Sequence, residues 1–216
     1  MKIAIFFEGN PKMGGGFFQS LKSSLMITNI NEYKEQMELI ITDKEANTYF
    51  LDKKIKTRFF KVNIFKRYYC QLFEIDLIKN LLNKIKINHP FTNFIKKENY
   101  DLVIFLGPSI YAKYSKDISF VVNIWDLDHK KNSQFPEHNN NFTFENRENY
   151  INEIIYRAFK IIVPHENNKK DLINYYKCDK KNITVQNFIP MLPTIFENNK
   201  SQSIDYRKIY EKFQLP

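Results

Sequence analysis

The chain of 216 residues is long enough for one large domain. Hydrophobic residues make up 43% and aromatic residues 16%, which disfavours wholesale disorder, and no apolar run is long enough to span a bilayer. The net charge of +9 indicates attraction to an anionic partner: a membrane surface, a nucleotide or a nucleic acid. Nucleic-acid binding is disfavoured because the basic residues are dispersed, largely balanced by acids, and form no recognised motif.

Strands and helices are predicted to alternate along the chain, beginning with a buried strand at 2–7 and a helix at 17–27. Further strands are predicted at 37–42, 101–106, 118–124, 160–163 and 183–185, with one or two extended pieces at 48–60. A long helix is predicted at 63–87, ending near His89-Pro90, and further helices at 146–159 and 166–176. This alternation predicts an α/β fold, a Rossmann-like parallel sheet flanked by helices.

The pattern changes after residue 190. Residues 193–203 are polar and aperiodic, as in a linker, and 205–213 carry one short helical pattern. We therefore expect a domain at 1–192, and a linker with the start of a helix at 193–216. The two cysteines, Cys70 and Cys178, share no metal-ligand spacing and are typical of reduced thiols in a cytosolic protein.

A glycine-rich loop, Gly14-Gly15-Gly16, separates the first strand from the first helix. Glycines let the backbone approach a ligand closely, and a helix N-terminus offers free N–H groups to a phosphate. The loop matches neither the dinucleotide fingerprint nor the P-loop, which disfavours those two classes. A flexible turn without a ligand explains the loop equally well.

The strand at 118–124 ends abruptly in a polar cluster containing Trp125, Asp126, Asp128 and His129. Open α/β sheets bind ligands at the carboxyl ends of their strands, so this loop is a candidate site. The alternative is a solvated loop in which Asp126 makes a turn with its own backbone.

The segment 53–69 interleaves lysines and arginines with aromatic residues. Such a segment suits an anionic membrane interface. The alternative, which we slightly favour, is a solvated helix face covering core aromatics.

Three segments together resemble the N-terminal domain of GT-B glycosyltransferases, specifically the retaining family four. The first is the opening MKIAIFFEGNPKMGGGFFQSL, which is similar to that family's strand, Gly-Gly loop and helix. The second is WDLDHKKNSQFPE, which is similar to the family's HDL…PE segment and closer to a subgroup with WDL-x-H…FPE. The third and most specific is the block from 145 to 190, including AFKIIVPHENNKKDLINYYKCDKKNITVQNFIP. Two positions depart from the family: His165 replaces a usual Ser, and Trp125 stands where many relatives have the His of HDL.

The resemblance implies a nucleotide-sugar donor, transfer with retention of configuration, and neither a cofactor nor a metal. It implies that the amides of Gly14, Gly15 and Gly16 face the donor diphosphate. Asp126 and His129 would be the catalytic residues, orienting acceptor hydroxyls and assisting proton transfer. The acceptor-binding residues would be Trp125, Asp128, Glu137 and Arg147. Three of these four have a structural alternative: Trp125 packs at the strand end, Glu137 caps the next helix, and Arg147 pairs with Glu148 on a helix surface.

The resemblance also implies a cell-surface or lipid-linked glycan as acceptor, and a cytoplasmic protein at the inner membrane face. The family's second Rossmann-like domain, which holds most donor contacts, has no match in this sequence, so the chain alone is expected to be inactive. The alternative is a non-catalytic remnant that binds a glycan or a partner protein.

Overall fold

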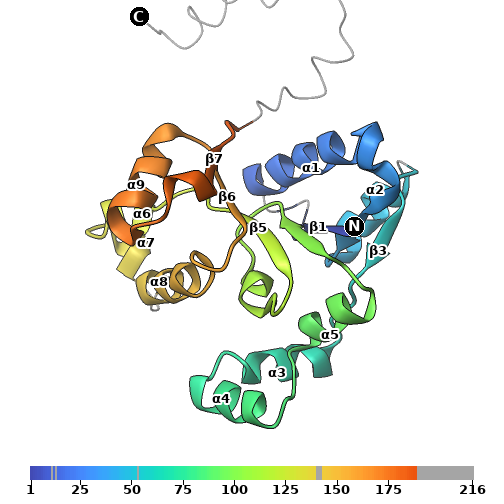
Figure 1. Cartoon of the computed structure of the whole chain (residues 1–216), viewed down its shortest axis with the longest axis horizontal. Coiled ribbons are helices and arrows are strands. Elements are labelled where there is room, and N and C mark those ends of the chain that lie inside the picture. Colours follow the sequence, from blue (N-terminus) through green and yellow to red (C-terminus); the bar gives the residue numbers. More distant parts are fainter. Residues whose placement is uncertain (11, 13, 53, 140–142, 189–216) are drawn as a thin grey trace, which may run out of the picture.

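The computed structural model describes residues 1–10, 12, 14–52, 54–139 and 143–188. The linker and helix expected at 193–216 lie outside these residues. Within them, seven strands form one fully parallel sheet in the order β3-β2-β1-β4-β5-β6-β7. The prediction of a Rossmann-like parallel sheet flanked by helices is confirmed (Figure 1).

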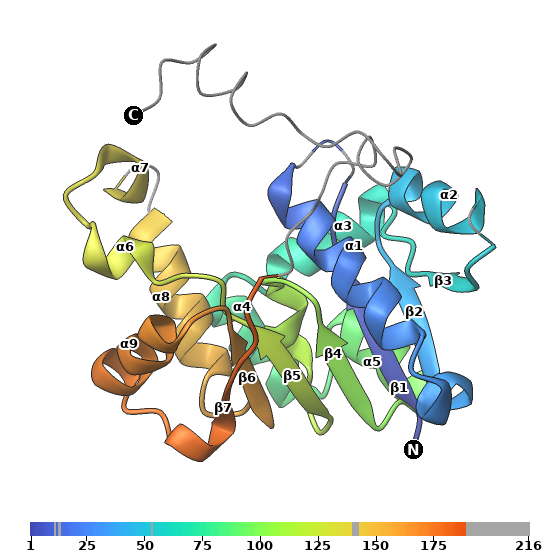
Figure 2. The ribbon, with the colours of Figure 1, turned by 90° about the horizontal axis from the view of Figure 1, so that it is seen from above.

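The strands lie side by side in a twisted row, as Figure 2 shows. They are β1 (Ile3–Phe7), β2 (Met37–Ile41), β3 (Thr57–Phe59), β4 (Leu102–Phe105), β5 (Ser119–Asn123), β6 (Lys160–Val163) and β7 (Ile183–Val185). All five residues of β1 are buried, as expected for a central parallel strand with helices on both faces.

The α-helices are α1 (Gly15–Thr28), α2 (Lys44–Asp52), α3 (Ile64–Leu72), α4 (Asp76–Lys84), α5 (Pro90–Lys97), α6 (Asp128–Lys131), α7 (Pro136–Asn139), α8 (Thr143–Ile154) and α9 (Glu166–Tyr176). Three short 3₁₀ helices are η2 (Asn31–Gln36), η3 (Ile110–Tyr114) and η5 (Lys180–Asn182). No helix of the described part of the chain is both long and apolar enough to cross a membrane.

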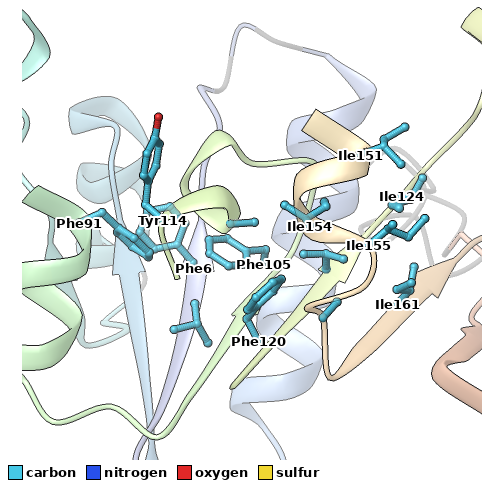
Figure 3. Close-up of a cluster of buried hydrophobic side chains, with 14 of the residues drawn as sticks. Phe6, Phe91, Phe105, Tyr114, Phe120, Ile124, Ile151, Ile154, Ile155 and Ile161 are labelled. Atoms are coloured by element: carbon cyan, nitrogen blue, oxygen red, sulfur yellow. The ribbon is translucent and has the colours of Figure 1, made fainter. Parts of the chain in front are cut away.

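The sheet separates two hydrophobic clusters because successive side chains of a strand point to opposite faces. From β1, Ile5 and Phe7 join α1 and α2 on one face. Phe6 joins α5, α8 and η3 in a larger cluster on the other face. Figure 3 shows this larger cluster, in which Phe6 lies near the rings of Phe91 and Phe105.

The prediction of extended chain at 48–60 is wrong for its first residues, which belong to helix α2, and is confirmed only for β3. The carboxylate of Asp43 accepts a hydrogen bond from the Ala46 N–H at 2.9 Å and starts the helix. Ala46 and Phe50, one turn apart, then bury a stripe against the sheet.

The single long helix predicted at 63–87 is also wrong in part, because α3 ends at Leu72 and α4 begins at Asp76. Between them, Phe73 enters the core and Glu74 binds Lys113 at 2.8 Å. The predicted stop near His89-Pro90 is instead the start of α5. His89 accepts a hydrogen bond from the Phe91 N–H, and Pro90 occupies a first-turn position where it loses no helical bond.

Candidate functional site

The order of strands reverses beside β1, because the chain runs from β1 to β3 in one direction and then continues from β4 in the other. Ligands of open α/β sheets bind at this point, outside the carboxyl ends of the strands. A cavity of about 410 Å³ opens there. We call it the switch-point cleft; its lining includes Glu8, Gly16, Gly107, Trp125, Asp126, His129, Arg147 and Tyr150.

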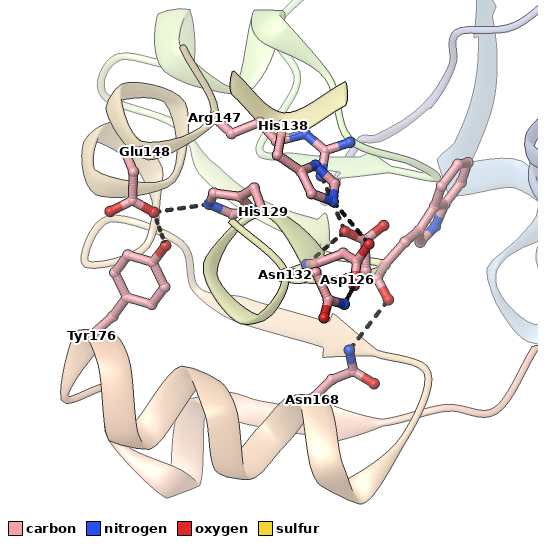
Figure 4. Close-up of polar contacts among 10 residues, drawn as sticks. Asp126, His129, Asn132, His138, Arg147, Glu148, Asn168 and Tyr176 are labelled. Atoms are coloured by element: carbon pink, nitrogen blue, oxygen red, sulfur yellow. Dashed lines mark hydrogen bonds and ion pairs between the residues drawn. The ribbon is translucent and has the colours of Figure 1, made fainter. Parts of the chain in front are cut away.

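His129 is fully buried in the first turn of α6 and lines the cleft. Its Nε2 lies 2.9 Å from Oε1 of Glu148 on α8 (Figure 4). Its Nδ1 is buried and has no hydrogen-bond partner among the described residues. Burial lowers the pKa of His129 and the nearby Glu148 carboxylate opposes this, with a lowered pKa as the net result.

Glu148 is held by more than His129. Lys130 lies 2.7 Å from Oε2, and the Tyr176 hydroxyl donates to Oε1. Burial by itself raises the pKa of Glu148, but the hydrogen bonds from Lys130, Tyr176 and His129 together lower it. Glu148 is therefore ionised at neutral pH, which places the single proton of a neutral His129 on Nε2 and leaves the Nδ1 lone pair as an acceptor.

Asp126 and Arg147 face each other at the cleft, where Arg147 Nη1 donates to Asp126 Oδ1 at 3.2 Å. Both side chains are about half exposed. The same Asp126 oxygen accepts the Asp128 N–H at 3.1 Å, so the expected turn with its own backbone is present as well. Arg147 and Glu148 do not form the surface pair considered from sequence, because each binds a different partner in the loop after β5.

Asp128 and Glu137 are not among the residues that line the switch-point cleft. The Asp128 carboxylate binds His138 at 3.0 Å and also accepts from Asn132, which ties α6 to α7. Glu137 is exposed in the first turn of α7. The geometry gives Asp128 a part in holding the loop together.

Trp125 is half buried, and its ring lies against two glycines. A Cβ atom at Gly16 would lie 2.9 Å from Cζ3 of the ring, and one at Gly107 would lie 2.9 Å from Cζ2. The ring therefore joins the end of β5 to the first turn of α1 and to the loop that follows β4. Packing at the strand end explains much of this residue.

Helix α1 starts at Gly15, and no described side chain caps it. Gly14 has a positive φ of 70°, a conformation that glycine adopts without strain. Of the three glycines, only Gly16 lines the cleft. The free first-turn N–H groups of α1 are thus near the cleft, where they offer a partial positive charge.

Glu8 follows β1 directly and lines the cleft, although no sequence motif pointed to it. Glu8 is exposed in part, but desolvation by the protein around its carboxyl group raises its pKa to about 6, and a hydrogen bond with Ser109 opposes the shift. Glu8 also lines a second cavity of about 460 Å³, which extends beside the cleft to Arg67 and Gln71 on α3 and to Tyr111. Its position at the end of the first strand was the available sequence signal.

A cavity of about 590 Å³ lies at the amino ends of β1 and β2, near Lys2 and Met37. Its Arg58 is already bound to Glu38 at 2.8 Å and to Glu98 at 2.5 Å. Because it lies at the opposite end of the strands from the switch-point cleft, it is the weaker candidate. Nowhere in the described chain do three or more His, Cys, Asp or Glu side chains gather as a metal site.

No model of a known protein family matches this sequence, and no curated protein matches it. Among solved structures, the chain is similar to Anabaena Alr3699/HepE in complex with UDP and glucose, at 14% identity and a TM-score of 0.56. That alignment covers 99% of this chain and 50% of the other. The fold is GT-B-like.

A putative UDP-N-acetylglucosamine 2-epimerase from Listeria monocytogenes is similar at 18% identity and a TM-score of 0.50, over 84% of this chain and 43% of its own. A glycosyltransferase from Rickettsia africae matches at 16% identity and a TM-score of 0.47, over 100% of this chain and 50% of its own. The chain therefore spans about half the length of these proteins. At such identities, the first two similarities establish the fold of one Rossmann-like half.

Proposed function

We propose that this chain is the acceptor-binding half of a glycosyltransferase that uses a nucleotide sugar. The observation that carries the proposal is His129, whose Nε2 is fixed by Glu148 while its buried Nδ1 is unpartnered among the described residues at the switch-point cleft. A neutral imidazole held in this way accepts a hydrogen bond from a sugar hydroxyl. The similar Anabaena structure holds UDP and glucose, which supports a nucleotide-sugar donor.

In this proposal the acceptor hydroxyl lies between His129 Nδ1 and the Asp126–Arg147 pair. Asp126 accepts a hydrogen bond from a neighbouring hydroxyl, and Arg147 holds Asp126 in place. Trp125 offers part of its ring to a sugar face. The first-turn N–H groups of α1, at Gly15 and Gly16, stabilise the negative charge that develops on the departing diphosphate.

A second Rossmann-like domain, whichever chain carries it, would supply most contacts to the nucleotide. The acceptor would be a cell-surface or lipid-linked glycan, and the enzyme would work in the cytoplasm at the inner membrane face. No metal or other cofactor takes part in the proposed step.

Retention of configuration is the course expected from the family resemblance. Glu8 gives a specific reason to measure it, because a carboxylate with a pKa of about 6 is suited to take the proton of an acceptor hydroxyl. A general base in that position would favour a single displacement with inversion. The anomeric configuration of the product, determined by NMR, decides between the two.

The test follows amide signals of the full chain during titration with UDP-glucose and with a panel of glycans. We expect shifts at Gly16, Asp126 and His129, and their loss in His129→Gln. The matched control is His165→Gln, because His165 is exposed at the start of α9 and should leave binding unchanged. Shifts confined to residues outside the cleft, or no shift with any ligand, would contradict the proposal.

A further inference from the structure

Helices α3 and α4 each carry exposed apolar side chains in addition to those that face the core. On α3 these are Ile64, Phe65, Tyr68 and Leu72, whose spacing places them along one side of the helix. Phe65 is 84% exposed, which is unusual for so large an apolar ring. A different side of this helix, at Tyr69, packs against the hydrophobic core.

The same arrangement recurs on α4. Leu77 and Leu81 are one turn apart and 77% and 55% exposed, and Ile85 continues their line just beyond the helix. Leu82 packs against the core on another side. Figure 1 shows α3 and α4 at the lower edge of the molecule, where they project from the rest of the fold.

Basic residues are interspersed with these apolar residues along the sequence. The sequence from 61 to 86 holds six basic and two acidic residues. Of the six, five are exposed and form no ion pair with a described acid; they are Lys61, Lys66, Arg67, Lys84 and Lys86. The charge of Glu74 is paired with Lys113 at 2.8 Å, and its carboxylate also accepts a hydrogen bond from the Tyr114 hydroxyl.

Exposed apolar side chains flanked by cations that pair with no described acid complement an anionic lipid surface, because the apolar groups enter the interface and the cations meet the headgroups. Two copies of this surface would bring like charges together, so the charge pattern disfavours self-association. We propose that α3 and α4 dock this protein on an anionic bilayer.

This surface differs from the segment 53–69 considered from sequence. Phe60 is buried, and Arg58 is bound by Glu38 and Glu98 at the sheet edge, so the first half of that segment has little to offer a membrane. Only the part from Lys61 onward belongs to the docking surface.

The proposed function places the protein at a membrane, and α3 and α4 would be the surface that binds it. The docking proposal rests on the proposed function only for that location. Vesicle binding is measured without donor or acceptor, whereas ligand titration is done without lipid. Either proposal can therefore fail while the other stands.

The experiment is flotation of the full chain with vesicles of phosphatidylcholine alone, or of phosphatidylcholine mixed with phosphatidylglycerol. We expect binding to the anionic vesicles only, weakened by added salt. Phe65→Ser with Leu77→Ser should reduce the partition coefficient at least about tenfold. The matched control is Phe159→Ser with Leu51→Ser, which removes the same side-chain types at 61% and 53% exposure elsewhere, and should bind as the unmodified chain does.

A second pair of variants tests the charges. Lys61→Gln with Lys84→Gln should weaken binding to anionic vesicles and reduce its salt dependence, whereas Lys34→Gln with Lys180→Gln should not. The proposal is overturned if the chain floats with neither vesicle type, or if the two serine pairs behave alike. It is also overturned if light scattering detects a dimer that Phe65→Ser with Leu77→Ser abolishes while flotation is absent, since the surface would then bind a second copy.

Discussion

Alanine at Gly16 would place a methyl group against Trp125, whereas alanine at Gly15 would meet no described atom within 4 Å. The new Cβ at Gly16 would lie 2.9 and 3.0 Å from two ring carbons, although carbon atoms prefer separations of roughly 3.5–4.0 Å. The ring or the helix must therefore shift. Such overpacking costs about 1–3 kcal/mol.

Both substitutions also gain about 0.5–1 kcal/mol because alanine suits a helix better than glycine. We therefore expect Gly15→Ala to be slightly stabilised, and Gly16→Ala to have a free energy of unfolding about 1–3 kcal/mol below it. Urea unfolding followed by tryptophan fluorescence measures both, since Trp125 is the one tryptophan of the chain.

A third variant isolates the contact. In a Trp125→Leu background, where urea unfolding is followed by circular dichroism because no tryptophan remains, the difference between Gly16→Ala and Gly15→Ala should largely disappear, because the atoms that clash are gone. Equal unfolding midpoints for the two alanine variants in the unmodified background would refute the reasoning, as would a difference that survives the removal of Trp125.

Desolvation by the surrounding protein raises the pKa of the partly exposed Glu8 to about 6, so its contribution to stability is present below about pH 4.5 and is lost as the pH rises through 6. Glu8→Gln should therefore stabilise the protein more at pH 7.5 than at pH 4.5, and an equal effect on urea unfolding at both pH values would contradict this. Burial lowers the pKa of His89 to about 3, so that contribution is present above pH 6.5 and is lost as the pH falls towards 3. His89→Asn keeps an acceptor for the Phe91 N–H and should flatten the pH dependence of the unfolding midpoint below pH 6.5; an unchanged slope would count against it. Asp126→Ala breaks a half-exposed pair with Arg147 and should cost less than about 1 kcal/mol of stability while removing glycan binding in the cleft, as calorimetry would report.

The strands other than β3 could be predicted from sequence because each is a short, mostly apolar run. The helices α1, α8 and α9 could be predicted because their apolar residues recur at helical spacing, although α8 ends at Ile154 and not at residue 159. The errors come from local signals that the apolar pattern obscures. Asp43 marks the start of α2 and Pro90 the start of α5, yet both lie in segments whose apolar residues also suit other structures. At the break between α3 and α4, Phe73 enters the core and Glu74 binds Lys113, and no local pattern contains these long-range contacts.

Of the candidate site, too, one part could be predicted from sequence and another could not. Asp126 and His129 follow a predicted strand, so their position at the cleft was foreseeable from the topology. The orientation of His129 could not be predicted, because it depends on residues far away in the chain. Glu148, which binds His129, lies 19 residues from it, and Tyr176, which binds Glu148, lies 28 residues from Glu148. Asp128 looked equivalent to Asp126 in sequence, and only the fold shows that it binds Asn132 and His138 instead.

Helix α3 borders both the docking surface and the second cavity. One side carries Phe65, exposed to solvent, and another presents Arg67 and Gln71 to the second cavity. If a bilayer restrains this helix, then a ligand in that cavity binds a helix whose freedom is already reduced. Linkage is reciprocal. If vesicles change the affinity of the protein for that ligand by some factor, the ligand must change the affinity of the protein for vesicles by the same factor. The helix would then make attachment to a surface and occupancy of the cavity a single coupled equilibrium.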